Sequence, residues 1–381
     1  MWRALDETCR RGVAEGAFPG AVVLAGDSRE LLLLRAYGCR ALAPEPLPMT
    51  PDTVFDLSSL TKPMATTTAM MLLVRDGRVL LDDPACTVIP EFGRGARAAV
   101  TFRQLLNHTS GLPAWKPYYE SAIPVKAAIR ERSGTPAGRS GESAAAAGGR
   151  CLERLHDEEL VAAPGEQCLY SDLGFMLLGE AIERLSGRPL DLFCRDEMFA
   201  PMGLSSTFFA DLGSPEPRPG AVRAIAATED CPWRRKILCG EVHDDNAFAM
   251  GGVAGHAGVF SSAPDVHRFL RFLGRCHVDA EPDFLPGVVV REFLEAERTL
   301  PGQTHVLGWD TPSPEGSSSG RHFSARTVGH LGFTGTSIWW DLERDVHVVF
   351  LTNRVHPSRD NAAIREYRPL VHDAVMEGLC S

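Results

Sequence analysis

The chain has 381 residues, of which 44% are hydrophobic and 23% are charged, and its formal net charge at pH 7 is −10. This composition is typical of a globular protein with a substantial core, arranged as one large domain or two ordinary ones. The acidic balance and the scattered Lys and Arg residues argue against nucleic-acid binding. The longest apolar run, residues 69–74, is far shorter than the ~18 or more residues of a membrane span.

The N-terminal segment mixes acidic and basic residues without an apolar stretch, so it does not resemble a secretory signal. Ten cysteines are scattered along the chain without a Cys-x-x-Cys motif, which favours a reducing compartment over a disulfide framework. We therefore expect a cytoplasmic protein, or a periplasmic one if a leader has been removed. No pattern in the sequence indicates an oligomeric state.

Two β-hairpins are predicted close to the chain ends. Residues 20–27 and 30–38 are β-rich runs around a turn, and residues 335–343 and 345–354 form the second pair. Between and after them, apolar spacing and terminal turn residues predict helices, which span residues 63–75, 101–107, 173–186, 264–273 and 358–379. We expect an α/β (α+β) fold in which one antiparallel sheet, built from both chain termini, is flanked by helices.

The expected organisation is a single domain over residues 1–381. Its sheet subdomain comprises roughly residues 1–57 and 225–381, and a helical subdomain comprises roughly residues 58–224. Within the helical subdomain, residues 133–150 are rich in Gly, Ala and Ser and lack apolar periodicity. That composition predicts a mobile surface insertion.

Lysine is rare in this chain and occurs at four positions, one of which is Lys62. Lys62 follows Ser59 by three residues, so the two side chains share one face if this segment opens a helix. A lysine, unlike an arginine, can lose its proton when it is desolvated or placed near another cation. The spacing indicates a nucleophilic serine with a basic partner, and an ordinary helix start capped by Ser58 or Ser59 is the alternative.

A Ser-x-x-Lys motif has defined companions in serine β-lactamases and penicillin-binding proteins. This sequence contains Tyr-Ser-Asp at residues 170–172 and His-Leu-Gly at residues 330–332. Together with segments such as LLNHTSGLP, YSDLGFMLLGE and GHLGFTGTSIWWD, these motifs make nearly the whole chain resemble the β-lactamase and penicillin-binding-protein family. It is most similar to the class C-like branch, which also contains esterases and penicillin-binding-protein-4B-like proteins. The resemblance implies a β-lactamase/transpeptidase-like fold with the site in a cleft between the sheet and a helical subdomain.

The resemblance also implies a role for each motif residue. Ser59 is the expected nucleophile, which forms an acyl-enzyme, and Lys62 is expected to contact both Ser59 and Tyr170. Either Lys62 as a free amine or Tyr170 as a phenolate accepts the serine proton, and Tyr170 assisted by Lys62 is preferred. The backbone amides of Ser59 and Phe333 form the implied oxyanion hole. No cofactor or metal is implied.

Two motif positions depart from the β-lactamase pattern. Asp172 stands where those enzymes have Asn, and His330 stands where they have the Lys of Lys-Thr-Gly. Asp172 is either a helix cap or a site residue, and His330 is either a catalytic group whose cation lowers the pKa of Tyr170 or a structural strand-end histidine. If both face the site, its positive potential is lower than in a β-lactamase, and anionic substrates should bind less well.

The remaining candidates concern the walls of the site and a metal. Gly332, Trp115 and Tyr118 are expected to contact substrate, although surface packing explains the two aromatic residues equally well. The run of residues 243–245, His-Asp-Asp, lacks a spaced third histidine, so we predict no metal site there. Two further histidines in family-like segments, His108 and His256, are expected to stabilise turns.

These features predict a serine hydrolase that cleaves carboxylic esters or related amides. One alternative is a β-lactamase or a D-alanyl or D-amino-acid peptidase that acts on β-lactams or peptidoglycan-type peptides. Another, of a different class, is an inactive protein that binds peptidoglycan fragments. The expected partner is therefore a small ester, amide or β-lactam.

Overall fold

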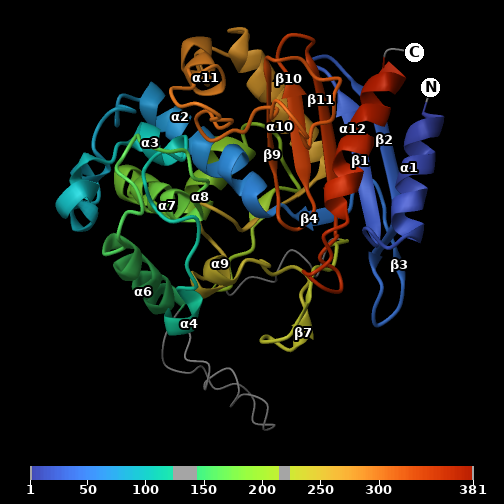
Figure 1. The fold of residues 1–381 in the computed structure, drawn as a ribbon, viewed down its shortest axis with the longest axis horizontal. Helices are drawn as coiled ribbons and strands as arrows, with labels where there is room; N and C mark the ends of the chain where they lie inside the picture. The colour runs from blue at the N-terminus through green and yellow to red at the C-terminus, as the bar shows by residue number, and fades with distance from the viewer. Residues whose placement is uncertain (1, 123–143, 214–223, 380–381) are drawn as a thin grey trace.

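The computed structural model describes residues 2–122, 144–213 and 224–379. In Figure 1 a sheet with helices on both faces lies beside a mainly helical part, and the two chain termini lie close together. The α-helices are α1 (Arg3–Ala14), α2 (Thr68–Arg75), α3 (Phe102–Leu106), α4 (Tyr119–Ala122), α6 (Ala144–His156), α7 (Asp172–Ser186), α8 (Leu190–Cys194), α9 (Asp245–Ala249), α10 (Ala263–His277), α11 (Gly287–Leu294) and α12 (Ile364–Leu379).

The strands and the shorter helical turns complete the fold. The strands are β1 (Gly20–Gly26), β2 (Leu31–Ala41), β3 (Leu47–Pro48), β4 (Val54–Asp56), β5 (Phe208–Phe209), β6 (Asp230–Cys231), β7 (Lys236–Ile237), β8 (Val259–Ser262), β9 (Thr327–Leu331), β10 (Ser337–Asp341) and β11 (Val346–Thr352). The 3₁₀ and π turns are η1 (Ser58–Leu60), η2 (Lys62–Thr67), η3 (Ala85–Thr87), η4 (Pro90–Phe92), η5 (Gly95–Ala99) and η6 (Arg195–Phe199).

The six-stranded sheet has the order β3-β2-β1-β11-β10-β9, and its paired strands are antiparallel. Its central pairing joins the two ends of the chain, because β1 lies against β11 with Leu24 opposite Val349. Both predicted hairpins are present as β1–β2 and β10–β11. The expectation of an antiparallel sheet built from both termini and flanked by helices is confirmed.

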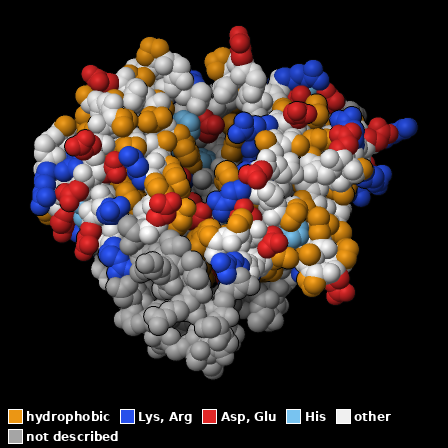
Figure 2. All heavy atoms as spheres, turned by 60° about the horizontal axis from the view of Figure 1, so that its bottom comes forward, with side chains coloured by type: hydrophobic (Ala, Val, Ile, Leu, Met, Phe, Trp, Pro, Cys, Tyr) orange, Lys and Arg blue, Asp and Glu red, His pale blue; other side chains and the backbone are white. Residues whose placement is uncertain are grey.

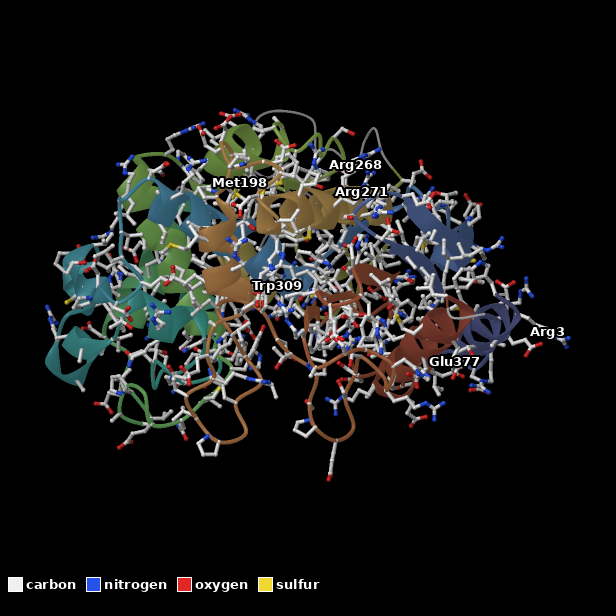
Figure 3. The ribbon with its side chains drawn as sticks, turned by 90° about the horizontal axis from the view of Figure 1, so that it is seen from above. Arg3, Met198, Arg268, Arg271, Trp309 and Glu377 are labelled. Carbon is white, nitrogen blue, oxygen red and sulfur yellow. The ribbon has the colours of Figure 1, made fainter. Side chains whose placement is uncertain are left out.

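Both faces of this sheet are covered, so β1 is buried along its whole length. Side chains alternate between the faces. Val22 and Leu24 belong to the large core that contains residues of α10, whereas Ala21 and Val23 pack into a second core with α1 and α12. Figure 3 shows α1 and α12 together at one end of the molecule, where Arg3 and Glu377 are labelled. A strand buried on both faces is continuously apolar, as the sequence of β1 is.

The predicted helices are present with shifted ends. Of the helix predicted at 63–75, residues 63–67 belong to η2 and residues 68–75 form α2. The helix predicted at 358–379 begins at Ile364, because turns precede it. Of the predicted mobile insertion, residues 144–150 are the start of α6, and the rest lies outside the described residues. Within the described residues, no helix has the length and apolar character needed to cross a membrane.

Trp309 lies in the interior of the molecule and is 0% exposed (Figure 3). The chain around it connects α11 to β9, and the backbone N–H of Asp310 donates to Gly329 of β9. Gly308 N–H donates to Leu106 at the end of α3. This segment therefore ties the helical part to the edge strand of the sheet.

A buried pair of histidines joins α10 to β11. His267 Nδ1 and His347 Nε2 lie 2.7 Å apart. Burial, and then the charges of Arg271 and Arg268 on α10 (Figure 3), lower the pKa of His267 to about 4. Burial and the neighbouring His267 lower the pKa of His347 to about 3. Both imidazoles are therefore neutral in the folded protein.

This pair should make stability depend on pH. Unfolded histidine has a pKa of ~6.5, so below that pH the unfolded chain takes up protons that the folded chain does not. We expect the two neutral histidines to make their full contribution to the free energy of unfolding above pH ~6.5. As the pH falls to ~5.5, the free energy of unfolding should decrease by about 1 kcal/mol per histidine. In urea titrations over this range, His347→Gln should flatten the pH dependence of the free energy of unfolding. The control variant His322→Gln, at a more exposed site, should leave this pH dependence unchanged. Equal slopes of the free energy of unfolding against pH in the two variants would contradict the role of the buried pair.

Candidate active site

Ser59 and Lys62 lie in consecutive helical turns, η1 and η2, and their side chains meet. Lys62 Nζ lies 3.0 Å from Ser59 Oγ, and the lysine is 0% exposed. Nζ also donates to Asp172 Oδ1 at 2.6 Å and to the backbone carbonyl of His256 at 3.2 Å. An ammonium has three N–H donors, so each of them has an acceptor here.

The start of α7 places Asp172 in the site. Ser171 is the N-cap of this helix, because its Oγ accepts from the backbone N–H of Gly174. Asp172 is the first helical residue, and its carboxylate forms the ion pair with Lys62. Of the two roles that the sequence leaves open for Asp172, the structure favours a site residue, since Ser171 supplies the cap.

The ion pair governs the protonation of both expected bases. Burial lowers the pKa of Lys62, but Asp172 and Tyr170 more than offset it, so the pKa is raised and Lys62 is an ammonium at neutral pH. Lys62 and Ser59 act to lower the pKa of Tyr170, yet burial dominates and raises it. Both groups predicted to accept the serine proton therefore already carry a proton at neutral pH.

Three imidazoles surround the Tyr170 ring. The ring centroids of His108, His305 and His330 lie 4.6, 5.6 and 6.0 Å from it. Burial, and then Lys62, lower the pKa of His330 well below its usual value, so the cation expected there is absent at neutral pH. His330 Nδ1–H donates to its neighbour's carbonyl at 2.9 Å, which leaves Nε2 unprotonated. His305 was missed, because no motif marks the loop that contains it.

The expected oxyanion amide of Phe333 is engaged in a hydrogen bond within the protein. Its N–H donates to Ser58 Oγ at 3.2 Å, so a substrate oxygen must displace this hydroxyl. Ser58 itself has a φ of 51°, in the left-handed region that non-glycine residues seldom adopt. Gly332 is required on steric grounds, because a Cβ there would lie 2.0 Å from Thr336 Oγ1 and 2.6 Å from the Leu57 carbonyl oxygen.

Two cavities meet at Ser59, with volumes of about 750 and 350 Å³. Figure 2 shows a hollowed face with His side chains inside the hollow and Lys or Arg side chains beside it. The larger cavity is lined by Ser59, Tyr170, Asp172, His305, Asp310, Gly316, Ser318, His330, Leu331, Gly332, Phe333, Arg354, Arg359, Asp360, Ala362, Ile364, Arg365 and Arg368.

The smaller cavity decides between the two aromatic candidates. Trp115 lines it and is 44% exposed. Tyr118 lines neither cavity at Ser59, because it is buried and its hydroxyl donates to Glu158 Oε2 at 2.7 Å. The structure therefore does not bring Tyr118 to the site, because its ring belongs to the large core and its hydroxyl is bonded to Glu158.

The His-Asp-Asp run at residues 243–245 takes part in ion pairs. His243 Nε2 lies 3.2 Å from Glu229, and Asp245 pairs with Arg234 and Arg359. Asp244 Oδ1 lies 2.8 Å from His256 Nε2 and accepts from a backbone N–H of α9. In the described part of the chain, no group of three or more His, Cys, Asp or Glu residues is arranged to hold a metal.

The two histidines expected to stabilise turns contact residues of the site. His256 provides the carbonyl that accepts from Lys62, and its ring contacts Asp244. His108 Nδ1 accepts from the backbone N–H of Ser171 at 3.1 Å, while its ring packs against Tyr170. Both therefore support the residues around Ser59.

Comparison with known proteins identifies the family. The family described as Beta-lactamase matches residues 5–372. The chain belongs to the β-lactamase family. An N-acetylmuramyl-L-alanine amidase of Bacillus subtilis (strain 168) is 30% identical over 379 residues, 93% of this chain and 81% of that protein. A putative D-alanyl-D-alanine carboxypeptidase of Escherichia coli (strain K12) is 28% identical over 364 residues, 89% of this chain and 79% of that protein.

Solved structures of similar fold cover nearly the whole chain. EstCE1, a hydrolase with promiscuous acyltransferase activity, has a TM-score of 0.71 at 21% identity and covers 98% of both chains. A D-stereospecific amidohydrolase from Streptomyces sp. has a TM-score of 0.64 at 22% identity, covering 93% of this chain and 94% of that one. At these identities the likeness confirms the fold, which is β-lactamase/transpeptidase-like.

The backbone at Ser58 generates a stability prediction. Ser58→Ala and Ser58→Gly both remove the hydroxyl that accepts from Phe333, but only glycine adopts a φ of 51° without steric cost. We expect the Gly variant to be more stable than the Ala variant by about 1 kcal/mol in thermal unfolding. An Ala variant as stable as the Gly variant would show that this backbone is unstrained.

Proposed function

We propose that this hydrolase of the β-lactamase family cleaves carboxylic esters or related amides through an acyl-enzyme on Ser59. The observation that carries the proposal is the contact between Ser59 Oγ and the buried Lys62 ammonium, at the junction of two cavities. One cavity can take the acyl group and the other the leaving group. A serine needs an acceptor for its proton before it attacks, so the proton route is the central question.

Asp172 is the acceptor that we propose. Lys62 first passes the proton of its hydrogen bond with Asp172 to that carboxylate and becomes a free amine. As Ser59 Oγ then attacks the carbonyl carbon, its proton passes to the lone pair of Lys62 Nζ. The 3.0 and 2.6 Å hydrogen bonds along this route support it, as does the raised pKa of Tyr170, which opposes a resting phenolate. When the leaving group departs, the same route returns the proton to it.

The developing oxyanion is stabilised by the backbone amides of Ser59 and Phe333 in this proposal. The Phe333 ring is held from two sides, with the Arg354 guanidinium 4.4 Å and the His243 ring 5.7 Å from its centroid. Arg354 Nε also donates to the Phe333 carbonyl at 2.8 Å. These contacts limit the movement of the amide when Ser58 Oγ gives way to substrate.

One observation favours a second candidate, a peptidase or amidase acting on substrates with a carboxylate. The expectation that anionic substrates bind poorly was based on Asp172 and His330 alone. Asp172 is neutralised by Lys62, and arginines line the larger cavity. The relatives named as an amidase and a putative carboxypeptidase agree with this candidate.

A substrate panel tests the proposed function. The wild-type protein should react with a fluorophosphonate probe. It should hydrolyse p-nitrophenyl butyrate faster than nitrocefin, and D-alanyl-D-alanine peptides are the third substrate class of the panel. Ser59→Ala should lose labelling and at least about 1,000-fold in kcat, because the nucleophile is gone. The control Ser318→Ala, whose side chain lines the same cavity, should remain labelled. Labelling that survives Ser59→Ala would refute the assignment.

The proton route predicts a change in the pH–rate profile. Asp172→Asn removes the terminal acceptor, so ester hydrolysis at pH 7 should fall by about 100-fold or more. Activity should then recover as pH rises, because Lys62 loses the charge that raises its pKa and becomes a free amine. The matched control Asp172→Glu keeps a carboxylate and should keep the wild-type shape of the profile. An unchanged profile in Asp172→Asn would exclude this route.

A further inference from the structure

Three arginines in the wall of the larger cavity have no carboxylate partner within the described residues. Arg354 follows β11, and Arg365 and Arg368 lie on α12. Arg354 is 7% exposed and Arg368 is 8% exposed, whereas Arg365 reaches solvent. Arg359, in the same wall, differs because it pairs with Glu229 and Asp245. The cavity therefore contains three guanidiniums that form no ion pair within the described residues.

The hydrogen bonds of the two buried arginines go to backbone carbonyls. Besides its bond to Phe333, Arg354 donates from Nη1 to the carbonyls of residues 359 and 361, at 2.9 and 2.6 Å. Arg368 Nη2 donates to the carbonyls of Gly332 and Thr336, at 2.7 and 3.1 Å, and its buried Nε has no acceptor in the described structure. Carbonyl dipoles orient these guanidiniums but do not neutralise them.

A purely structural role accounts for those hydrogen bonds but not for the charge. Removing a cation from water is costly unless an anion compensates it, and here the charge of Arg354 acts on the buried Arg368. Burial first, and then the neighbouring arginines, lower the pKa of both Arg354 and Arg368 to about 10. Both stay protonated at neutral pH, so the uncompensated charge persists there.

We propose that Arg354, Arg365 and Arg368 form a subsite for a doubly charged oxyanion group, a phosphate or a pair of carboxylates, on the part of the substrate that enters this cavity. The proposal deepens, and for its link to catalysis rests on, the proposed function. Two buried charges require two negative charges, so a single carboxylate leaves one guanidinium unpaired. The planar fork of N–H donors on a guanidinium matches the oxygens of carboxylates and phosphates.

The carboxylates that line the same cavity have other neighbours. Asp310 Oδ1 lies 3.9 Å from His305 Nε2, and Asp360 accepts from the hydroxyl of Ser358 at 3.3 Å. Asp172 is paired with Lys62. As carboxylates these groups repel an anion, so the anion is expected to contact the arginines directly, and a substrate that is negatively charged throughout is disfavoured.

Anion binding to full-length Ser59→Ala measures the subsite without requiring catalysis. At pH 8 and low salt, calorimetric titration with inorganic phosphate, malonate and acetate should show binding of the two dianions. Acetate should bind about tenfold more weakly, since one of the buried guanidiniums stays uncompensated. Tighter binding of phosphate than of malonate would assign a phosphate group to the substrate, and the reverse order would assign paired carboxylates.

Arginine variants in the same background test which groups bind the anion. Arg354→Gln should weaken phosphate and malonate binding about tenfold, because a buried charged donor is lost. Arg365→Gln lies at an exposed position that can change without loss of folding, and it should weaken binding about twofold to fivefold. The control Arg29→Gln, on the turn between β1 and β2 and outside the cavity, should bind like its parent.

Equal affinities for acetate and the dianions would overturn the subsite, as would unchanged dianion affinity in Arg365→Gln and in folded Arg354→Gln. These anion-binding experiments can fail or succeed independently of the proposed hydrolysis. Arginine-dependent phosphate or malonate binding, with no ester hydrolysis by wild type, would support the subsite and refute the hydrolysis. Ester hydrolysis through Ser59 without arginine-dependent anion binding would refute the subsite alone.

Discussion

The candidate site depends on one buried cation and the groups that compensate it. An ammonium removed from water is costly unless a counter-charge and acceptors replace its hydration. Lys62 obtains them from three segments: Ser59 in η1, Asp172 at the start of α7 and the carbonyl of His256 before β8. The interaction that keeps Lys62 charged thus also holds the helical part of the molecule against the segment that leads into β8.

The sheet contributes the opposite wall of the site. Because β1 pairs with β11, the C-terminal hairpin lies in the centre of the sheet and β9 at its edge, where the chain turns at Gly332 and Phe333 beside η1. Arg368 reaches from α12 to the carbonyl of Gly332, so the last helix braces this turn. A covering helix and the reactive centre are in this way parts of one packed unit.

Charge in the site is divided between a compensated and an uncompensated region. Lys62 and Asp172 form a neutral pair next to the nucleophile, and the surrounding histidines are neutral because burial lowers the pKa of His108 and His330. Net positive charge lies instead on the arginines of the larger cavity. A substrate would therefore be oriented by groups at a distance from the reacting atoms, while the centre itself stays free of unpaired charge.

The sequence by itself determined the two hairpins, most of the helices, the family and the serine and lysine that meet at 3.0 Å. Strand alternation, helix periodicity and motif spacing are local properties, so they can be seen in one dimension. The tertiary structure decided that Ser171 caps α7 and Asp172 faces Lys62, that Tyr118 packs away from the site, and that His305 and four arginines line it. It also decided the protonation of Lys62 and Tyr170. Burial and charge compensation depend on which distant segments come together, and no residue pattern along the chain records that.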